Sequence, residues 1–185
     1  WGGGSHILQE YQGGYATYNL SGGLPSANKG DIHPDVGMGG TPRKIPGRYI
    51  PVSQGFFVTA EGAGGTINFN NGQRIFEKED GSLDGSSVFM RSADNNYYRM
   101  ETNENDPRMK FRIGFNSINQ IQRQLLLTID EKATVNKDWG YDGRINESQT
   151  DDMFWLIEDE NFIIQGSDIL DEFVRYPVGY KTANA

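Results

Sequence analysis

Residues 48–76 read RYIPVSQGFFVTAEGAGGTINFNNGQRIF, and the fold is predicted outward from this stretch. Residues 54–60 are aromatic and β-branched with apolar side chains at both parities, which is typical of a strand covered on both faces. Residues 66–69 alternate between polar and apolar side chains, which is typical of a half-buried strand. Between them, the glycines of residues 61–65 can adopt positive φ, so the stretch predicts a β-hairpin.

Short strands are also indicated on both sides of this hairpin. A pair of strands around an acidic tip is predicted at residues 153–157 and 162–165, and other apolar or alternating runs occur at residues 15–20, 88–91, 97–100, 110–115, 123–129 and 173–176. No heptad, solenoid period or long amphipathic helix is present. The pattern predicts an all-β protein, an antiparallel β-sandwich of jelly-roll type with long Gly/Pro-rich loops.

Two regions are expected along the chain. Residues 1–47 form a Gly/Pro-rich strand and loop region, in which proline removes backbone donors and favours irregular structure. Residues 48–185 form the β-sandwich module. We expect this module to be truncated at both ends from a larger polypeptide.

Composition excludes several classes of function. The net charge of -8 disfavours a nucleic-acid groove, which needs a basic face, and disfavours docking on an anionic membrane. The absence of cysteine excludes disulfides and thiolate chemistry. No apolar run approaches the roughly 20 residues that span a bilayer, so membrane insertion is not expected.

An ordered set of motifs resembles a known family. The motifs are IPVSQGFFV, GTINFNNGQRIF, FMRS, RQLLLTIDEKAT, DWGYDGR, FWLIEDENFIIQG and YPVGYKT. In this order they resemble a β-rich module of large secreted or cell-surface Bacteroidota proteins that are exported by the type IX secretion system. The resemblance implies an extracellular or outer-membrane cell-surface location. It also implies a place upstream of a C-terminal sorting domain that this sequence lacks, and contact with the secretion machinery during export.

No residue pattern predicts catalysis. His6 and His33 lie in Gly/Pro-rich segments, and no G-x-S-x-G nucleophile elbow accompanies them. Residues 31–35, DIHPD, offer three polar side chains to a metal, but such proline-containing loops are common. The 25 acidic residues make chance carboxylate pairs inevitable, and nothing singles out a glycosidase pair. We therefore expect no catalytic residues and no organic cofactor.

Residues 138–143, DWGYDG, are the candidate calcium loop. Short Asp/Gly loops offer carboxylate and carbonyl oxygens to this hard cation. The EF-hand pattern fails at its third position, which is Gly140 here. The competing interpretation is a plain turn anchored by its aromatic side chains. If calcium binds, the candidate ligands are Asp138, Asp142, Asp151 and Asp152.

Exposed aromatic rings could stack on the apolar face of a sugar. The candidate glycan platform consists of Trp139, Trp155, Tyr97 and Tyr98. The competing interpretation places these rings in the core, where most aromatic side chains lie.

Three functions are weighed on these grounds. The first is a non-enzymatic structural or adhesive module of a type IX-secreted cell-surface protein. The second is a carbohydrate-binding module of a surface adhesin or glycan-degrading enzyme, with surface glycans as partners. The third, a glycoside hydrolase or lyase, needs a cleft with converging carboxylates and ranks last.

Overall fold

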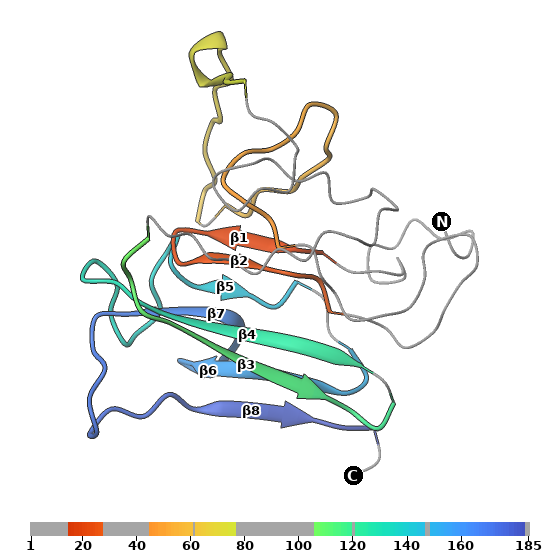
Figure 1. Ribbon diagram of the computed structural model, residues 1–185, viewed down its shortest axis with the longest axis vertical. Helices are drawn as coiled ribbons and strands as arrows, with labels where there is room; N and C mark the ends of the chain where they lie inside the picture. The colour runs from red at the N-terminus through yellow and green to blue at the C-terminus, as the bar shows by residue number, and fades with distance from the viewer. Residues whose placement is uncertain are drawn as a thin grey trace.

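The computed structural model describes residues 15–27, 45–60, 62–76, 106–119, 121–146 and 149–183. These residues form eight strands and one 3-10 turn (Figure 1). The elements are β1 (Thr17–Asn19), β2 (Gly22–Leu24), η2 (Asn71–Gln73), β3 (Lys110–Asn116), β4 (Gln122–Ile129), β5 (Gly143–Arg144), β6 (Asp152–Ile157), β7 (Glu160–Ser167) and β8 (Val178–Lys181).

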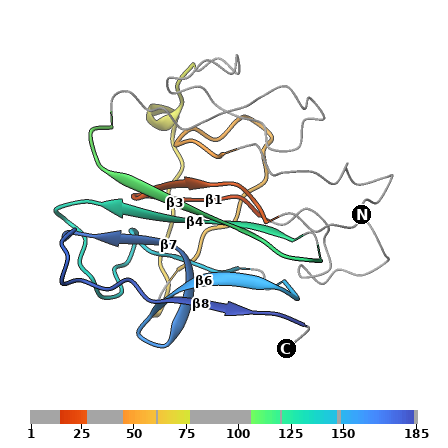
Figure 2. The same cartoon turned by 60° about the horizontal axis from the view of Figure 1, so that its bottom comes forward.

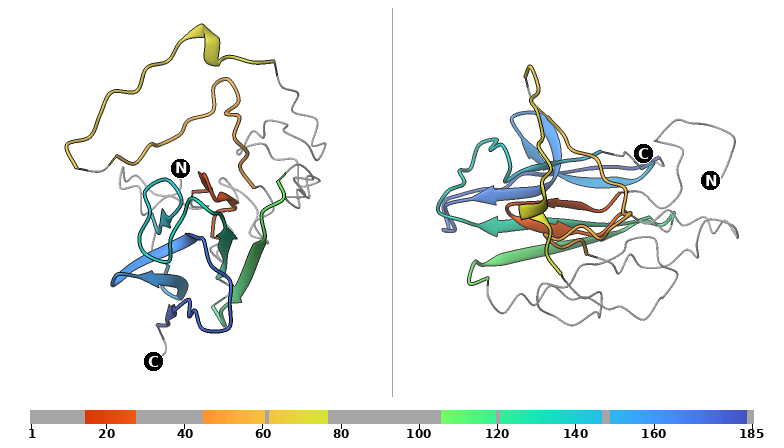
Figure 3. Two further views of the ribbon diagram at one scale, coloured as in Figure 1. Left: turned by 90° about the vertical axis from the view of Figure 1, so that its left-hand side faces the viewer. Right: turned by 90° about the horizontal axis from the view of Figure 1, so that it is seen from above.

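The larger sheet has six strands and is built around β7. Its main order is β3-β4-β7-β6-β8, and β5 also pairs with β7. Ile164 is partnered by both β4 and β5, and Phe162 by both β6 and β5. Because a strand has two edges, β4 and β6 must follow one another along the edge of β7 opposite β5. This change of partner along one strand accompanies the strong curl of the sheet (Figures 2 and 3).

Trp155 stabilises the place where β7 changes partner. It is the first residue of β6 that pairs with β7, and its indole Nε1 donates to the carbonyl oxygen of Leu126 at 3.0 Å, where the β4 pairing begins. The side chain is only 3% exposed. A buried donor without a partner would cost about 1–3 kcal/mol, so this hydrogen bond favours Trp155 at the junction.

The smaller sheet is the β1–β2 hairpin, which packs on β4. Leu24 of β2 is fully buried in the main apolar cluster. Thr128 Oγ1 donates to the carbonyl oxygen of Ser21 at 2.8 Å. Both faces of β4 are therefore covered, which accounts for its nearly continuous apolar run LLLTI.

The core lies between the hairpin and the inside of the curl. Its fully buried members come mainly from β4, β6 and β7, and they are Leu24, Leu125, Leu126, Leu127, Met153, Trp155, Ile157, Phe162, Ile163 and Ile164. The predicted hairpin with an acidic tip is confirmed as β6–β7. Its turn residues Glu158 and Asp159 both adopt positive φ, at 49° and 65°.

The predicted hairpin in residues 48–76 is wrong. Gly62 and Gly64 adopt positive φ as expected, and Asn71–Gln73 forms a capped turn, but residues 54–60 and 66–69 form no strand. The segment is extended and projects from the body of the molecule (Figure 1). A two-stranded hairpin is marginal without a third partner, and this segment packs its apolar faces against no sheet.

The predicted last strand is displaced. Residues 173–176 form a turn and coil, and β8 starts only after Pro177. Asp171 Oδ1 accepts hydrogen bonds from the backbone N–H groups of Phe173 and Val174, at 2.7 and 3.0 Å. Such a local side-chain acceptor competes with ladder formation, and the sequence pattern did not include it.

The all-β fold with a sandwich-like pair of sheets is confirmed. Strand pairing is antiparallel as predicted except for β4 with β7, which is parallel. The jelly-roll connectivity and the boundary at residue 47 remain predictions, and the strands expected at 88–91 and 97–100 lie outside the described residues. No helix in the described part of the chain has the length and apolar character needed to cross a bilayer.

Candidate functional site

The loop between β4 and β5, residues 130–142, carries the candidate site. Asp142 Oδ1 accepts the backbone N–H of Gly166 at 2.9 Å, and its Oδ2 accepts the backbone N–H of Asp138. Asp138 Oδ2 in turn accepts the backbone N–H of Thr134. The two carboxylates thus hold the loop closed on itself and fasten it to β7.

The pKa of Asp142 is raised to about 6. Burial is the main cause, because it removes water from the carboxylate. The nearby charges of Asp138 and Glu158 raise it further, whereas the two backbone N–H donors lower it. Asp142 therefore titrates near neutral pH because the loop is closed over it.

The β1–β2 hairpin holds the other side of this loop. The carbonyl oxygen of Tyr141 accepts hydrogen bonds from Asn19 Nδ2 and Ser21 Oγ, at 2.9 and 2.7 Å. The carbonyl oxygen of Gly140 accepts the backbone N–H of Leu20 at 2.9 Å. Gly140 has φ of 86°, a conformation that suits glycine.

Trp139 stands out from this closed loop with 58% of its surface exposed. Charged groups lie on the same loop and on the adjacent hairpin: Glu160 Oε2 contacts Lys137 Nζ at 3.5 Å and Arg144 Nη2 at 2.5 Å. An exposed indole on a fixed backbone is chemically suited to stacking on the apolar face of a sugar ring.

Among the other members of the predicted glycan platform, Trp155 is described, and it does not lie with Trp139. Trp155 lies in the core at the β6–β7 junction, so its ring is unavailable to a glycan. Tyr97 and Tyr98 lie outside the described residues. The alternation of apolar residues in β6 did not reveal which face would be covered, because that depends on how the sheet curls.

The four predicted calcium ligands fall into two pairs with different surroundings. Asp152 makes a paired contact with Arg123, Oδ1 to Nε at 2.7 Å and Oδ2 to Nη2 at 2.9 Å, and the whole group is buried. Asp151 accepts hydrogen bonds from the backbone N–H of Ala183 and from Asn119 Nδ2, and the first of these is the main cause that holds its pKa below the usual value. Both carboxylates therefore tie strand ends together.

No three Asp, Glu or His side chains within the described ranges gather closely enough to hold one metal ion. Asp138 and Asp142 do lie together, as their spacing suggested. Three of their four carboxylate oxygens, two on Asp142 and one on Asp138, already accept backbone N–H groups. Calcium binding by this pair remains a prediction. The candidates His6 and His33 lie outside the described residues.

Two features were missed at the sequence level. The first feature is the buried ion pair of Arg123. The sequence pattern places Arg123 at the start of the apolar strand RQLLLTI, and a charged residue in such a strand is the available signal of a buried ion pair. The second feature is the exposure of the central stretch: residues 55–60 and 62–76 are all exposed. Its apolar pattern predicted the opposite, because burial depends on a partner that the pattern cannot name.

The fold and this loop define an all-β protein with a curled sheet, a covering hairpin and an exposed tryptophan on a fastened loop. Residues 6–185 match the family model described as Domain of unknown function (DUF8693), so the chain belongs to this family. No curated protein matches the chain, and no solved structure does.

Proposed function

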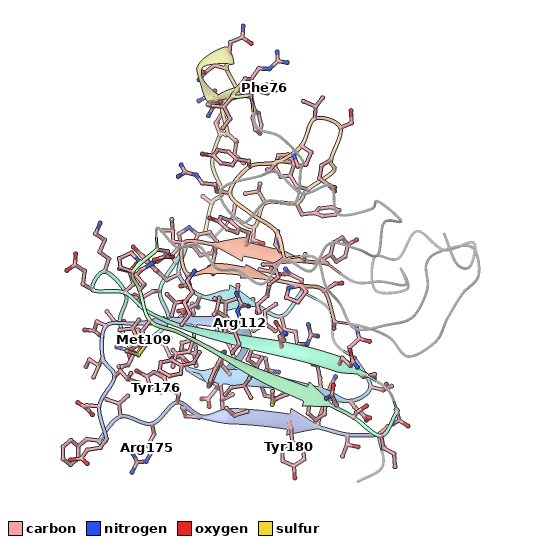
Figure 4. All side chains as sticks on the ribbon, viewed as in Figure 1. Phe76, Met109, Arg112, Arg175, Tyr176 and Tyr180 are labelled. Atoms are coloured by element: carbon pink, nitrogen blue, oxygen red, sulfur yellow. The ribbon has the colours of Figure 1, made fainter. Side chains whose placement is uncertain are left out.

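We propose that this chain is a non-enzymatic structural or adhesive module of a type IX-secreted protein at the cell surface. The observation that carries the proposal is the exposed apolar stretch between residues 50 and 76. Its exposed large side chains are Ile50, Val52, Phe56, Phe57, Val58, Ile67, Phe69, Ile75 and Phe76. Figure 4 shows Phe76 at the far end of the projecting segment. Apolar surface on this scale is typical of a contact with another macromolecule.

The polar groups support a binding role over catalysis. Asp151, Asp152 and Asp142 are engaged by backbone amides or by Arg123 and hold the fold together. The secreted and surface location is supported by the ordered motifs of the sequence and by its acidic composition.

The location is tested in the organism that carries the gene. An antibody against the module is expected to label intact cells, and this label is expected to disappear when the type IX machinery is disabled. Labelling that appears only after cells are permeabilised would contradict the proposal.

The alternative is a carbohydrate-binding module, which the exposure of Trp139 favours. A glycan array is expected to give saturable binding that Trp139→Ala abolishes without changing the melting temperature, since the indole is exposed. The matched control is Phe173→Ala, which removes another aromatic side chain that is 82% exposed. Binding that survives Trp139→Ala would contradict a site at this loop.

A further inference from the structure

We propose that residues 54–60 of one copy add as an antiparallel strand to the free edge of β3 in a second copy. This inference rests on the proposed structural role and names its partner, another copy of this chain. It requires an acceptor edge and a donor segment that fit one another, and the described residues provide both.

The acceptor edge is β3, which pairs only with β4 among the described strands. A strand with one free edge presents unpaired backbone N–H and C=O groups to any extended chain. Its side chains Phe111 and Ile113 are 39% and 38% exposed, and Phe115 on the same face packs against the core cluster. An added strand would therefore extend the apolar face that β3 leaves half covered.

The charges that usually protect an edge are withdrawn on β3. Lys110 Nζ lies 3.1 Å from Asp106 Oδ2, and its side chain is mostly buried. Arg112 Nη2 donates to the carbonyl oxygen of Gly23 at 3.1 Å, so it is directed towards the β1–β2 hairpin. Both charged groups are therefore held by contacts within the same copy.

The donor is the segment QGFFVTA, which is uncharged and forms part of no strand. It has seven residues, the same length as β3. Phe57 and Val58 are 71% and 57% exposed. A β-prone apolar segment that carries no charge and no proline is typical of a strand that adds to an open edge.

One antiparallel register fits both faces of the two segments. When Val58 lies opposite Ile113, Phe56 lies opposite Phe115 and Ala60 opposite Phe111, so apolar meets apolar three times. The same register places Phe57 opposite Gly114. The Cβ position of Gly114 has no atom within 4 Å, so an aromatic ring can cover it.

The donor of the same copy is directed away from this edge. Residues 54–60 and 62–76 project beyond the β1–β2 hairpin, whereas β3 lies on the other side of that hairpin (Figures 1 and 3). A second copy can bring its donor to β3 without any rearrangement of the sheet. The occupant that fits the structure is therefore the segment of another molecule.

Cysteine trapping tests the register directly, because the chain contains no cysteine. Phe57→Cys and Gly114→Cys are made in separate chains and mixed under mild oxidation. Directly opposed Cβ atoms in an antiparallel pair are about 4.5–5.5 Å apart, near disulfide range. We expect a disulfide-linked heterodimer. Val52→Cys mixed with Gly114→Cys is the matched control, since Val52 is at least as exposed as Phe57 (83% against 71%) but lies outside the register.

Equal yields from the two mixtures, or no cross-link in either, would overturn the proposal. The variant with both cysteines in one chain, oxidised at high dilution, tests the source of the donor. A cross-link within single chains there would overturn the assignment to a second copy. Cross-linked dimers that vanish on dilution before oxidation support it.

A complementation experiment tests whether residues 54–60 act as the donor and β3 as the acceptor. Val58→Lys places a charge in the donor, and Ile113→Lys places one in the acceptor; each is expected to weaken self-association by at least about tenfold in equilibrium sedimentation. Mixing the two variants restores one intact donor and one intact acceptor, so heterodimers are expected. Failure of the mixture to associate while both variants remain folded would contradict strand addition.

The outcome of these experiments is independent of the outcome of the surface-labelling test. Register-specific cross-links in a protein that does not reach the cell surface would retain strand addition and overturn the proposed location. Surface labelling without cross-links would do the reverse. If Ile113→Lys does not fold, the cysteine pairs still decide, because Phe57 is exposed and Gly114 has open space.

Discussion

Arg123 and Asp152 form a buried ion pair in the described part of the chain. Their side chains are 2% and 0% exposed, and Asp152 also accepts the backbone N–H groups of Gln149 and Met153. The carboxylate thus closes the start of β6 and fixes it to β4. Removing Arg123 would leave that carboxylate buried without its counter-ion.

We expect Arg123→Met to lower the free energy of unfolding by about 3–5 kcal/mol, because an uncompensated charge would remain in the core. Urea unfolding at neutral pH measures this. The matched control is Arg144→Met, which breaks an exposed ion pair with Glu160 and is expected to cost about 0–1 kcal/mol. Equal losses from both variants would show that the buried pair has no special role.

The raised pKa of Asp142 leads us to expect a pH dependence of the free energy of unfolding that is opposite in sign to ordinary acid denaturation. Its folded pKa of about 6 lies above the ordinary 3.8, so the native state keeps its proton longer than the unfolded state. Its contribution to stability is therefore fully present below about pH 4 and is lost as the pH rises to about 6. The change is about 2 kcal/mol after allowance for partial solvent screening.

The variant Asp142→Asn isolates this effect. The difference in unfolding free energy between wild type and variant is expected to vary between pH 4 and 6, with wild type losing relative stability as the pH rises. Asp159→Asn, at the exposed hairpin tip, removes the same charge without burial and should show no such trend. Wild type must be compared with the variant because Asp106 and Asp151 have lowered pKa values. Their contribution to stability is lost as the pH falls, which opposes the effect of Asp142.

At the scale of elements, β7 is the strand on which the others converge. It pairs with β4, β5 and β6, and three segments meet at Gly166. A Cβ there would lie 2.9 Å from Tyr141 Cβ, 3.0 Å from Ala133 Cβ and 3.1 Å from Ser21 Oγ. The absence of a side chain allows the loop and the β1–β2 hairpin to close over the strand.

We therefore expect Gly166→Ala to destabilise the protein by about 1–3 kcal/mol through overpacking. Gly114→Ala is the matched control on a strand, because its Cβ position is open; it is expected to be neutral or stabilising by roughly 0.5–1 kcal/mol. Thermal or urea unfolding of both variants checks this. A larger loss at Gly114 than at Gly166 would contradict the packing described.

At the scale of the whole molecule, charge opposes the proposed assembly. Each copy carries a net charge of -8, so two copies repel one another before the strand contact forms. We expect the rate of cross-linking between Phe57→Cys and Gly114→Cys chains to rise from low to physiological salt, since screening shortens the range of this repulsion. A rate that falls with salt would indicate instead that opposite charges drive the contact.

Local patterns predicted much of the sheet. The alternation in KFRIGF, the apolar run in RQLLLTI and the paired strands around the acidic tip all became strands, because neighbouring residues dictate those periods. The same kind of pattern failed in residues 54–60, where a strand needs a partner that lies elsewhere. It also failed at residues 173–176, where Asp171 caps the local backbone.

The candidate site divides in the same way. Proximity of Asp138 and Asp142 followed from their spacing in a short Asp/Gly loop. The exposure of Trp139 and the burial of Trp155 did not, because each depends on which surfaces the curled sheet brings together.

By itself, the sequence determined the all-β class, the acidic surface and the positions of most strands, since these depend on composition and on periods of a few residues. Only the tertiary structure decided that β7 exchanges one partner for another along a single edge and that Arg123 meets Asp152 in the core. It alone left an apolar segment exposed and gave β3 a single partner among the described strands. These outcomes depend on contacts between residues far apart in the chain, and such contacts are not encoded in any local pattern.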